Sequence, residues 1–299
     1  MIKSWTIGYA LAAGLVVAAA PAGAKQWKVL SEQTVTGFGH IESVGYDPQE
    51  KVFYTGDFGQ AMKPAEKDGK GKITKFSLDG KILQDGVFPA HGEVMNKPKG
   101  IWIAGGHLWV TDIDALWEFD LASKKSKRLP LPITYANDVA ILDGALYVGD
   151  NRSDTLIRIE PVDFLNGKAE PKITTVFAGE GVYPNGLWPM KDGGLLMVGF
   201  QAKDKPKGIY VLKQDGKPKE ISKDIGLLDG LYQTAQGDIL ATDWVSGTLF
   251  AWDDKAGVQK IADGFKGPAD FAVVPNDKGL LVAVPDLVKG EVRLIQLSR

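Results

Sequence analysis

Six residues that could hold a cation or act on a substrate recur along the chain, each ahead of a short apolar run. We call them the anchor residues: Glu42, Lys99, Asn137, Asn185, Asp229 and Asp270. Five of the six carry a side-chain oxygen, and carboxylate and amide oxygens are the ligands that Ca²⁺ prefers. Carboxylates that converge on one point repel one another and raise each other's pKa unless a cation lies between them. The pattern therefore predicts an oxygen-lined cation site.

The competing interpretation of the anchor residues is an ordinary turn. Asn185-Gly186 and Asp229-Gly230 are common turn dipeptides, and any one of them alone could be no more than that. However, each repeat has a separate turn signal further on, such as Asp192-Gly193-Gly194. The anchors are therefore not needed as hairpin turns. We expect the glycines after them to let the backbone bend tightly and approach a ligand closely.

The elements that must position the anchor residues follow from a repeat. Successive anchors are 57, 38, 48, 44 and 41 residues apart. After each comes a short apolar strand, a turn, a second strand, a third strand and a weaker fourth. Four short antiparallel strands with a period in the forties are typical of a β-propeller blade. The sequence predicts an all-β six-bladed β-propeller, with four antiparallel strands per blade and each anchor just before the innermost strand, at one mouth of the central channel.

The last repeat lacks its fourth strand, because the chain ends at Arg299. Residues 26–35 read as a strand, and we expect them to pair with the C-terminal blade and close the ring, which removes free sheet edges. The second strands often end in aspartate, which we expect to cap or brace loops: Asp57, Asp112, Asp150 and Asp243. A Lys- and Gly-rich insertion near residues 58–72 is expected to be a surface loop between blades 1 and 2. The tryptophans are expected mainly between blades, as core residues.

The amino-acid composition limits which partners and which kinds of catalytic or metal site are expected. The chain has 299 residues and a net charge of −2, so no basic field favours nucleic acid or an anionic membrane. It has no cysteine and three histidines, which excludes a thiol nucleophile and disfavours an imidazole-rich metal site. The expected cation is Ca²⁺, with Mg²⁺, Mn²⁺ or Zn²⁺ as the other candidates.

The N-terminal segment has the pattern of a secretory signal peptide. Lys3 is followed by an apolar run to about Ala20 and by the small residues Ala22-Gly23-Ala24. The apolar run is short for a membrane span, although an uncleaved anchor is the alternative. We expect residues 1–24 to be removed, residues 25–299 to form a single domain, and the protein to be periplasmic or secreted, without a membrane span.

At the anchor residues the chain resembles the senescence-marker-protein/gluconolactonase family of six-bladed propellers, and more distantly paraoxonases and strictosidine synthase. The resemblance rests on "IESVGYDP", "YANDV", "YPNGLWP" and "LLDGLY". It implies that Glu42, Asn185 and Asp229 bind a catalytic divalent metal, that Asn137 lies near the metal or substrate, and that Asp229 is the general base or nucleophile. The implied reaction is hydrolysis of a small-molecule lactone or ester.

Three residues depart from the family pattern or have no assigned role. Tyr135 stands two residues before Asn137, where members acting on sugar lactones tend to have arginine. Lys99 could bind an anionic substrate or balance charge. His40 lies two residues before Glu42 and could reach the channel mouth, or it could be structural. These three residues and Asp270 are candidates for the channel or substrate site.

Three functions remain open on the sequence. The first is a metal-dependent lactonase or esterase. The second is a non-catalytic propeller that binds a small molecule or a protein, with a structural metal or none. The third is another propeller chemistry, such as a strictosidine-synthase-like or redox enzyme. The loops over the channel mouth choose the substrate, and loops vary independently of the scaffold.

Overall fold

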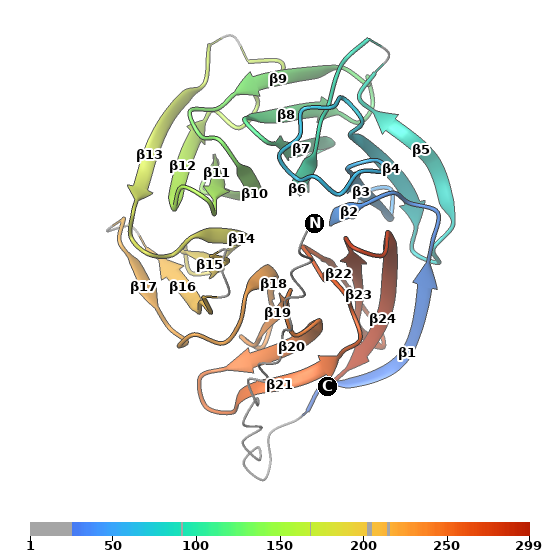
Figure 1. Ribbon diagram of the computed structural model, residues 1–299, viewed down its shortest axis with the longest axis vertical. Helices are drawn as coiled ribbons and strands as arrows, with labels where there is room; N and C mark the ends of the chain where they lie inside the picture. The colour runs from blue at the N-terminus through green and yellow to red at the C-terminus, as the bar shows by residue number, and fades with distance from the viewer. Residues whose placement is uncertain (1–25, 91, 168, 202–204, 214–215) are drawn as a thin grey trace, which may run out of the picture.

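The computed structural model of the protein describes residues 26–90, 92–167, 169–201, 205–213 and 216–299. Within these ranges the strands form six four-stranded antiparallel sheets, arranged as blades around a central channel (Figure 1). This arrangement confirms the six-bladed propeller. The expected signal peptide, residues 1–24, lies outside the described residues. Over the same described ranges, no helix is long and apolar enough to cross a membrane.

The first three blades are built from consecutive strands. Blade 1 contains β2 (Ile41–Asp47), β3 (Val52–Asp57), β4 (Lys72–Ser77) and β5 (Ile82–Phe88). Blade 2 contains β6 (Pro98–Ala104), β7 (His107–Asp112), β8 (Ala115–Asp120) and β9 (Ser126–Pro130). Blade 3 contains β10 (Ala136–Leu142), β11 (Ala145–Asp150), β12 (Thr155–Glu160) and β13 (Lys172–Ala178).

The other three blades complete the ring. Blade 4 contains β14 (Pro184–Pro189), β15 (Leu195–Gly199), β16 (Ile209–Leu212) and β17 (Pro218–Glu220). Blade 5 contains β18 (Leu228–Gln233), β19 (Ile239–Asp243), β20 (Thr248–Asp253) and β21 (Gly257–Ala262). Blade 6 contains β22 (Ala272–Asn276), β23 (Gly279–Asp286), β24 (Glu291–Ser298) and, from the other end of the chain, β1 (Lys28–Val35). The first-named strand of each blade lies innermost (Figure 1).

The N-terminal strand closes the ring as expected from residues 26–35. β1 pairs antiparallel with β24, with Val35 opposite Val292. Just before β1, the indole nitrogen of Trp27 donates a hydrogen bond to Asp238 of blade 5 over 3.2 Å. The two ends of the chain thus share one blade, and the described sheets leave no gap in the ring.

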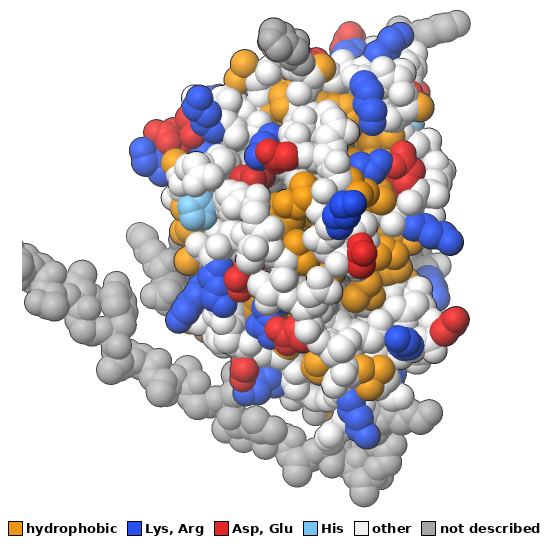
Figure 2. Space-filling model, turned by 90° about the vertical axis from the view of Figure 1, so that its right-hand side faces the viewer, with side chains coloured by type: hydrophobic (Ala, Val, Ile, Leu, Met, Phe, Trp, Pro, Cys, Tyr) orange, Lys and Arg blue, Asp and Glu red, His pale blue; other side chains and the backbone are white. Residues whose placement is uncertain are grey.

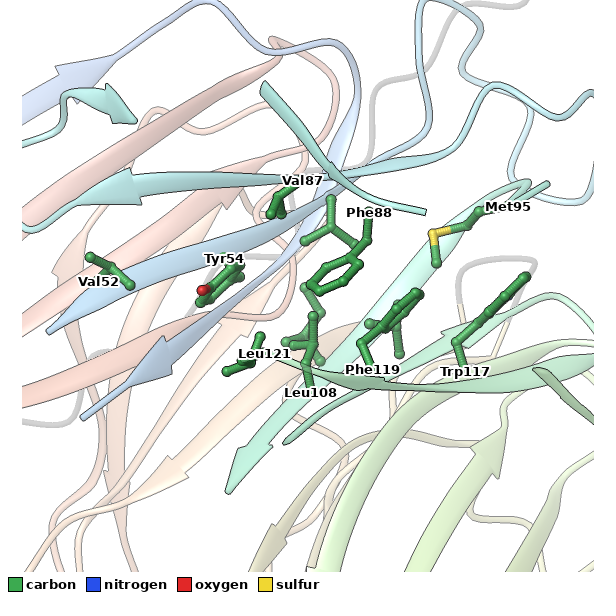
Figure 3. Close-up of a cluster of buried hydrophobic side chains, with 12 residues drawn as sticks. Val52, Tyr54, Val87, Phe88, Met95, Leu108, Trp117, Phe119 and Leu121 are labelled. Carbon is green, nitrogen blue, oxygen red and sulfur yellow. The ribbon is translucent and has the colours of Figure 1, made fainter. Parts of the chain in front are cut away.

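The hydrophobic cores lie between neighbouring blades. Between blades 1 and 2, Tyr54 and Phe88 pack near Leu108 and Phe119 (Figure 3), and the ring centroids of Phe88 and Phe119 are 4.3 Å apart. In the described part of the chain, every seam between adjacent blades has such a cluster. Because each blade buries its two faces against two neighbours, burial of apolar area stabilises the closed ring rather than any single sheet.

Each anchor residue from blades 1 to 5 lies at a β-bulge near the beginning of the innermost strand. In β14 the pairing steps from Pro184 with Gly199 to Leu187 with Met197, and Asn185 lies within the step. The same irregularity occurs in β2, β6, β10 and β18. A bulge re-aims the side chain of its extra residue. These five anchors are therefore the second residue of their strands, so the expectation that an anchor precedes its strand is wrong for them and holds only for Asp270.

The glycines after two anchors have a different role from the one expected. A Cβ added to Gly186 would lie 2.2 Å from the carbonyl oxygen of Asp229, and one added to Gly230 would lie 2.7 Å from Cα of Asp270. Neither glycine has a positive φ. Glycine is needed here because the innermost strands of neighbouring blades approach closely, not because the backbone turns tightly.

The aspartates that end the second strands brace loops, as expected. Asp112 accepts hydrogen bonds from the backbone nitrogens of Asn96 (2.9 Å) and Lys97 (2.7 Å). Asp57, Asp150 and Asp243 accept equivalent hydrogen bonds from backbone nitrogens that precede the innermost strand of the same blade. Asp57 and Asp243 also accept one from the backbone just after the second strand. These bonds hold the channel-mouth loops against the blades.

The outer surface has no single charge sign. Figure 2 turns the right-hand side of Figure 1 toward the viewer and shows acidic and basic side chains interspersed with apolar ones. This view agrees with the near-neutral net charge of −2.

Candidate metal and substrate site at the channel mouth

A cavity of about 640 Å³ opens at the channel mouth and brings together four of the anchor residues. Glu42, Asn137, Asn185 and Asp229 all line it. They come from four different blades, and the bulge at the second position of each innermost strand aims each side chain at the same place. We refer to this space as the mouth cavity. Its size is within the range of roughly 300–1,000 Å³ that small-molecule sites occupy.

Two side-chain oxygens in this group have no hydrogen-bond partner among the described residues. They are Oε2 of Glu42 and Oδ1 of Asn185, both buried. Nδ2 of Asn185 donates to the carbonyl oxygen of Leu228 over 3.1 Å, so the other end of the amide, the oxygen, is the one left unsatisfied. An unpaired buried polar group costs roughly 1–3 kcal/mol. A divalent cation between these oxygens would remove that cost.

The electrostatics of the carboxylates point in the same direction. Burial raises the pKa of Glu42 well above its ordinary value, and Asp229 raises it further while Lys99 opposes the rise. Burial also raises the pKa of Asp229, and Asp270 adds to the rise. A hydrogen bond from the Asn185 side chain favours the ionised form of Asp229. Two buried carboxylates that resist ionisation become favourable as ions only beside positive charge.

The residues present therefore fit a hard divalent cation. Glu42, Asn185 and Asp229 would supply oxygen ligands of the type that Ca²⁺ takes. Asn137 lines the same cavity, and its Nδ2 lies 3.4 Å from Oδ1 of Asn151. We call these four residues the floor of the mouth cavity. No imidazole lies among the residues that line the mouth cavity in the described structure.

Lys99 lies behind the wall of the mouth cavity. Its side chain is fully buried, and its ammonium nitrogen is 3.3 Å from the carbonyl oxygen of Lys97 and 4.4 Å from the centre of the Tyr135 ring. Burial lowers its pKa to about 8, although Glu42 favours the charged form. This position favours charge balance over substrate binding, the two alternatives that the sequence leaves open.

Asp270 lines a different cavity from four of the other anchors, although it is close enough to raise the pKa of Glu42 and Asp229. It lines a second cavity of about 200 Å³, together with Asp138, Trp102 and Trp188. Burial raises the pKa of Asp270 to about 7. It differs from the other anchors because it precedes β22 by two residues, and its backbone pairs in parallel with Ser43 of β2. Asp270 therefore does not line the mouth cavity with those four anchors, and its role as a channel residue stays a prediction.

His40 is tied to the rim of the site. Its Nδ1 lies 2.8 Å from the carbonyl oxygen of Leu287, and Leu287 itself lines the mouth cavity. The ring is half-buried. Its bond to the backbone supports the structural interpretation of this histidine.

The upper wall of the mouth cavity follows a rule that the sequence analysis missed. In five blades the wall contains the residue directly after the second strand: Phe58, Asn151, Phe200, Trp244 and Leu287. The sequence signal for this rule is that four of these residues directly follow the aspartates that end β3, β11, β19 and β23. Trp244 is thus a cavity residue, whereas Trp109 and Trp117 are buried between blades as expected.

Aromatic rings and a guanidinium shape the entrance. Tyr135 and Tyr183 line the mouth cavity, and the exposed Arg152 has its guanidinium carbon 3.6 Å from the centre of the Tyr135 ring. Tyr183 has a φ of 55°, a rare conformation for a residue with a side chain. Its backbone nitrogen donates to Asp154 over 2.5 Å, which holds it there. An arginine therefore lies beside Tyr135, and it comes from the turn after β11.

The Lys- and Gly-rich insertion covers part of the site. It connects β3 to β4 within blade 1, so its expected place between blades 1 and 2 is wrong. Met62 and Pro64 of the insertion line the mouth cavity. Its base is held by the buried Lys97, whose ammonium donates to the carbonyl oxygen of Phe58 (2.9 Å) and to Asp68 (2.7 Å).

Fold and site together define the class of protein: a six-bladed β-propeller with buried acidic and amide side chains at one mouth of its channel. No family model matches the chain, and no curated protein sequence matches it. Solved structures do match over nearly the whole chain.

A gluconolactonase from Xanthomonas campestris is similar at 13% identity with a TM-score of 0.65, covering 94% of this chain and 98% of that one. Virginiamycin B lyase from Staphylococcus aureus is similar at 14% identity with a TM-score of 0.58, covering 91% and 99%. A chain in a nidogen/laminin complex is similar at 17% identity with a TM-score of 0.57, covering 74% and 79%. These likenesses confirm the fold, including the resemblance to gluconolactonase propellers. They do not assign an activity, since the three differ in function.

Proposed function

We propose that this protein is a divalent-metal-dependent hydrolase of a small-molecule lactone or ester, and that Ca²⁺ is the metal. The observation that carries the proposal is the pair of buried, unsatisfied oxygens, Glu42 Oε2 and Asn185 Oδ1, beside Asp229 on the floor of the mouth cavity. Glu42, Asn185 and Asp229 would hold the cation, and Asn137 would lie beside the metal or the substrate. The fold likeness to a gluconolactonase agrees with this reaction class.

The chemistry divides between the cation and the side chains. When bound, a divalent cation stabilises negative charge that develops on the carbonyl oxygen of the substrate. Asp229 would accept a proton from the attacking water or attack the carbonyl carbon itself. Burial raises the pKa of Asp229, so a cation beside it would be needed to hold the carboxylate in the ionised form that either role requires; the hydrogen bond from Asn185 acts in the same direction as the cation.

The walls of the mouth cavity indicate the kind of substrate. Phe58, Phe200 and Trp244 present apolar surface, and Arg152 and Lys205 bring positive charge to the same space. We infer a substrate with an apolar or aromatic body and an anionic group that Arg152 can pair with. A compact neutral sugar lactone would leave much of this apolar wall in contact with water.

Location is also part of the proposal. The N-terminal pattern of residues 1–24 and the absence of cysteine from the 299 residues suit an exported protein that does not depend on disulfides. We propose that the protein acts in the periplasm or outside the cell. Fractionation of expressing cells, with N-terminal sequencing of the recovered protein, tests this; cytoplasmic protein that begins at Met1 would contradict it.

The test of function is Ca²⁺ calorimetry on the chain from Lys25, with lactone and aryl-ester hydrolysis measured in the same samples. Asp229→Asn should lower kcat/KM by about 10³-fold and weaken Ca²⁺ binding. Asp192→Asn, at an exposed turn, is the matched control and should change neither. Ca²⁺ binding without hydrolysis of any substrate would favour the non-catalytic propeller. Absence of Ca²⁺ binding would overturn the metal site itself.

A further inference from the structure

A second group of metal-ligand side chains lies away from the channel, at the seam between blades 2 and 3. It consists of His107, Glu118 and Asp163, whose potential ligand atoms all lie within 4.8 Å of one another. His107 begins β7, Glu118 lies in β8, and Asp163 follows β12 in the next blade. β7 runs from His107 to Asp112, which braces the channel-mouth loop, so this group lies about 17 Å along the strand from that loop.

The buried carboxylate of Glu118 is satisfied on one oxygen only. Oε2 accepts hydrogen bonds from the backbone nitrogens of Phe164 (2.7 Å) and Leu165 (2.8 Å). These bonds fix the carboxylate against the blade 3 segment that carries Asp163. Oε1 is buried and has no hydrogen-bond partner among the residues described, and the Glu118 side chain is 0% exposed. This unpaired oxygen of Glu118 is therefore the one available to a cation that His107 and Asp163 could also bind.

The contact between His107 and Glu118 is close but badly directed for a hydrogen bond. Nδ1 of His107 and Oε1 of Glu118 are 2.7 Å apart, and in the described structure neither atom makes a hydrogen bond of acceptable geometry. A close pair that forms no hydrogen bond is compatible with two ligands that converge on one metal ion. The His107 ring is also stacked on Trp109, with ring centroids 5.6 Å apart, which holds its orientation.

We propose that His107, Glu118 and Asp163 bind a zinc-type divalent cation that joins blade 2 to blade 3. One imidazole and two carboxylates are ligands that Zn²⁺ accepts at roughly 2.0–2.2 Å, and an imidazole favours Zn²⁺, Co²⁺ or Ni²⁺ over Ca²⁺. Asp163 lies at the surface end of the group and its Oδ1 accepts a hydrogen bond from the backbone nitrogen of Asn166 over 2.8 Å, so its other oxygen would take the cation, while the buried Glu118 is already placed.

The site has a structural purpose distinct from the channel. The Glu118 side chain bonds directly to the blade 3 backbone, so a cation held by Glu118 and Asp163 would link the seam through both blades. A ligand that binds the folded state and not the unfolded state stabilises the fold by mass action. Zinc at this site should therefore raise the unfolding temperature whether or not the protein hydrolyses anything.

The test is Zn²⁺ calorimetry on metal-stripped protein in the presence of saturating Ca²⁺, paired with thermal unfolding. Wild type should bind one Zn²⁺ and unfold at a higher temperature with it. His107→Gln and Asp163→Asn, both conservative changes at partly exposed positions, should weaken Zn²⁺ binding at least tenfold and remove the thermal shift. Co²⁺ gives a second readout, since it should quench Trp109 fluorescence in wild type and not in His107→Gln.

Two controls separate this site from the channel. His40→Gln removes a histidine elsewhere and should leave Zn²⁺ binding unchanged. Asp229→Asn alters the mouth cavity and should also leave it unchanged. The proposal is overturned if wild type shows no saturable Zn²⁺ binding, if His107→Gln and Asp163→Asn bind Zn²⁺ like wild type, or if Asp229→Asn abolishes the binding.

Discussion

The guanidinium carbon of Arg152 lies 3.6 Å from the centre of the Tyr135 ring, at the entrance of the mouth cavity. Arg152 comes from the turn after β11, and Tyr135 comes just before β10 of the same blade. A guanidinium over an aromatic face keeps its orientation, and Arg152 also hydrogen-bonds the Tyr135 side chain, which leaves its other N–H groups to bind a carboxylate. The pair therefore provides an oriented cation over the buried anchor residues.

Arg152 should select substrates that carry an anionic group. We expect Arg152→Ala to raise KM about tenfold for an ester or lactone with a carboxylate, and to change kcat little, because the guanidinium binds a part of the substrate away from the reacting carbonyl. Steady-state kinetics with matched anionic and neutral substrates measures this. Arg158→Ala, which removes a surface partner of Glu160, serves as the control. Equal losses for both substrates would contradict the selective role.

The carboxylates in the channel should make the metal-free protein less stable as pH rises. The folded-state pKa of Asp270 is about 7, above its ordinary value of 3.8, because burial disfavours the charged form. The folded state therefore holds a proton that the unfolded state has released, and stability is lost between about pH 4 and pH 7. Urea unfolding in chelator should give a lower free energy of unfolding at pH 8 than at pH 5.

Asp270→Asn isolates this contribution. The amide keeps the shape of the side chain and does not titrate, so the variant should lose less stability than wild type between pH 5 and pH 8. Glu42, Asp138 and Asp229 also have raised pKa values and will keep part of the slope. The same slope in variant and wild type would show that Asp270 is not protonated in the fold.

Lys99 should weaken cation binding at neutral pH. Its ammonium is buried near Glu42, so it repels a cation held by the same carboxylate, and its pKa is lowered to about 8. As pH rises through 8 the repulsion disappears, and wild-type Ca²⁺ affinity should increase. In Lys99→Met the affinity at pH 7 should already be several-fold higher, and the step near pH 8 should be absent. Calorimetry at pH 7 and pH 9 measures both effects, with exposed Lys213→Met as the control.

Gly186 should not tolerate a side chain. The Cβ of an alanine there would lie 2.2 Å from the carbonyl oxygen of Asp229, so the two innermost strands would have to separate. We expect Gly186→Ala to destabilise the fold by about 1–3 kcal/mol and to weaken Ca²⁺ binding, because Asn185 and Asp229 both lie at this contact. Gly193→Ala, with open space but a φ of 81°, should cost less than Gly186→Ala. A smaller loss for Gly186→Ala than for this control would contradict the steric reason.

The local pattern determined a large part of the architecture. Repeats such as "YPNGLWP" and "LLDGLY" carry the alternation of short strands and turns, and a unit that cannot bury both faces alone must stack on a copy of itself. The count of six, the closure by residues 26–35 and the bracing role of Asp112 all follow from that repetition. The blade count and the bracing aspartates depend on residues close together in the sequence, and the closure follows because the last repeat lacks the one strand that residues 26–35 supply.

The features that the sequence repeat did not predict depend on residues that become neighbours only in the folded structure. Asp270 differs from Asp229 in the position of its backbone relative to the next innermost strand, which sends it to the second cavity. Arg152 reaches Tyr135 because the turn after β11 folds over the start of β10. The spacing of residues within one repeat does not predict either contact.

The sequence by itself therefore determined the six-bladed ring, its closure and the six anchor residues, of which the structure brings four together in the mouth cavity. Only the tertiary structure decided that the anchors lie on bulges, that Lys99 is buried beside Tyr135, and that His107, Glu118 and Asp163 meet across a seam. The physical reason is that strand pairing within a blade and the alternation of buried and exposed residues depend on residues close together in the sequence. Contacts between blades arise only after the ring closes and brings distant residues within a few ångströms.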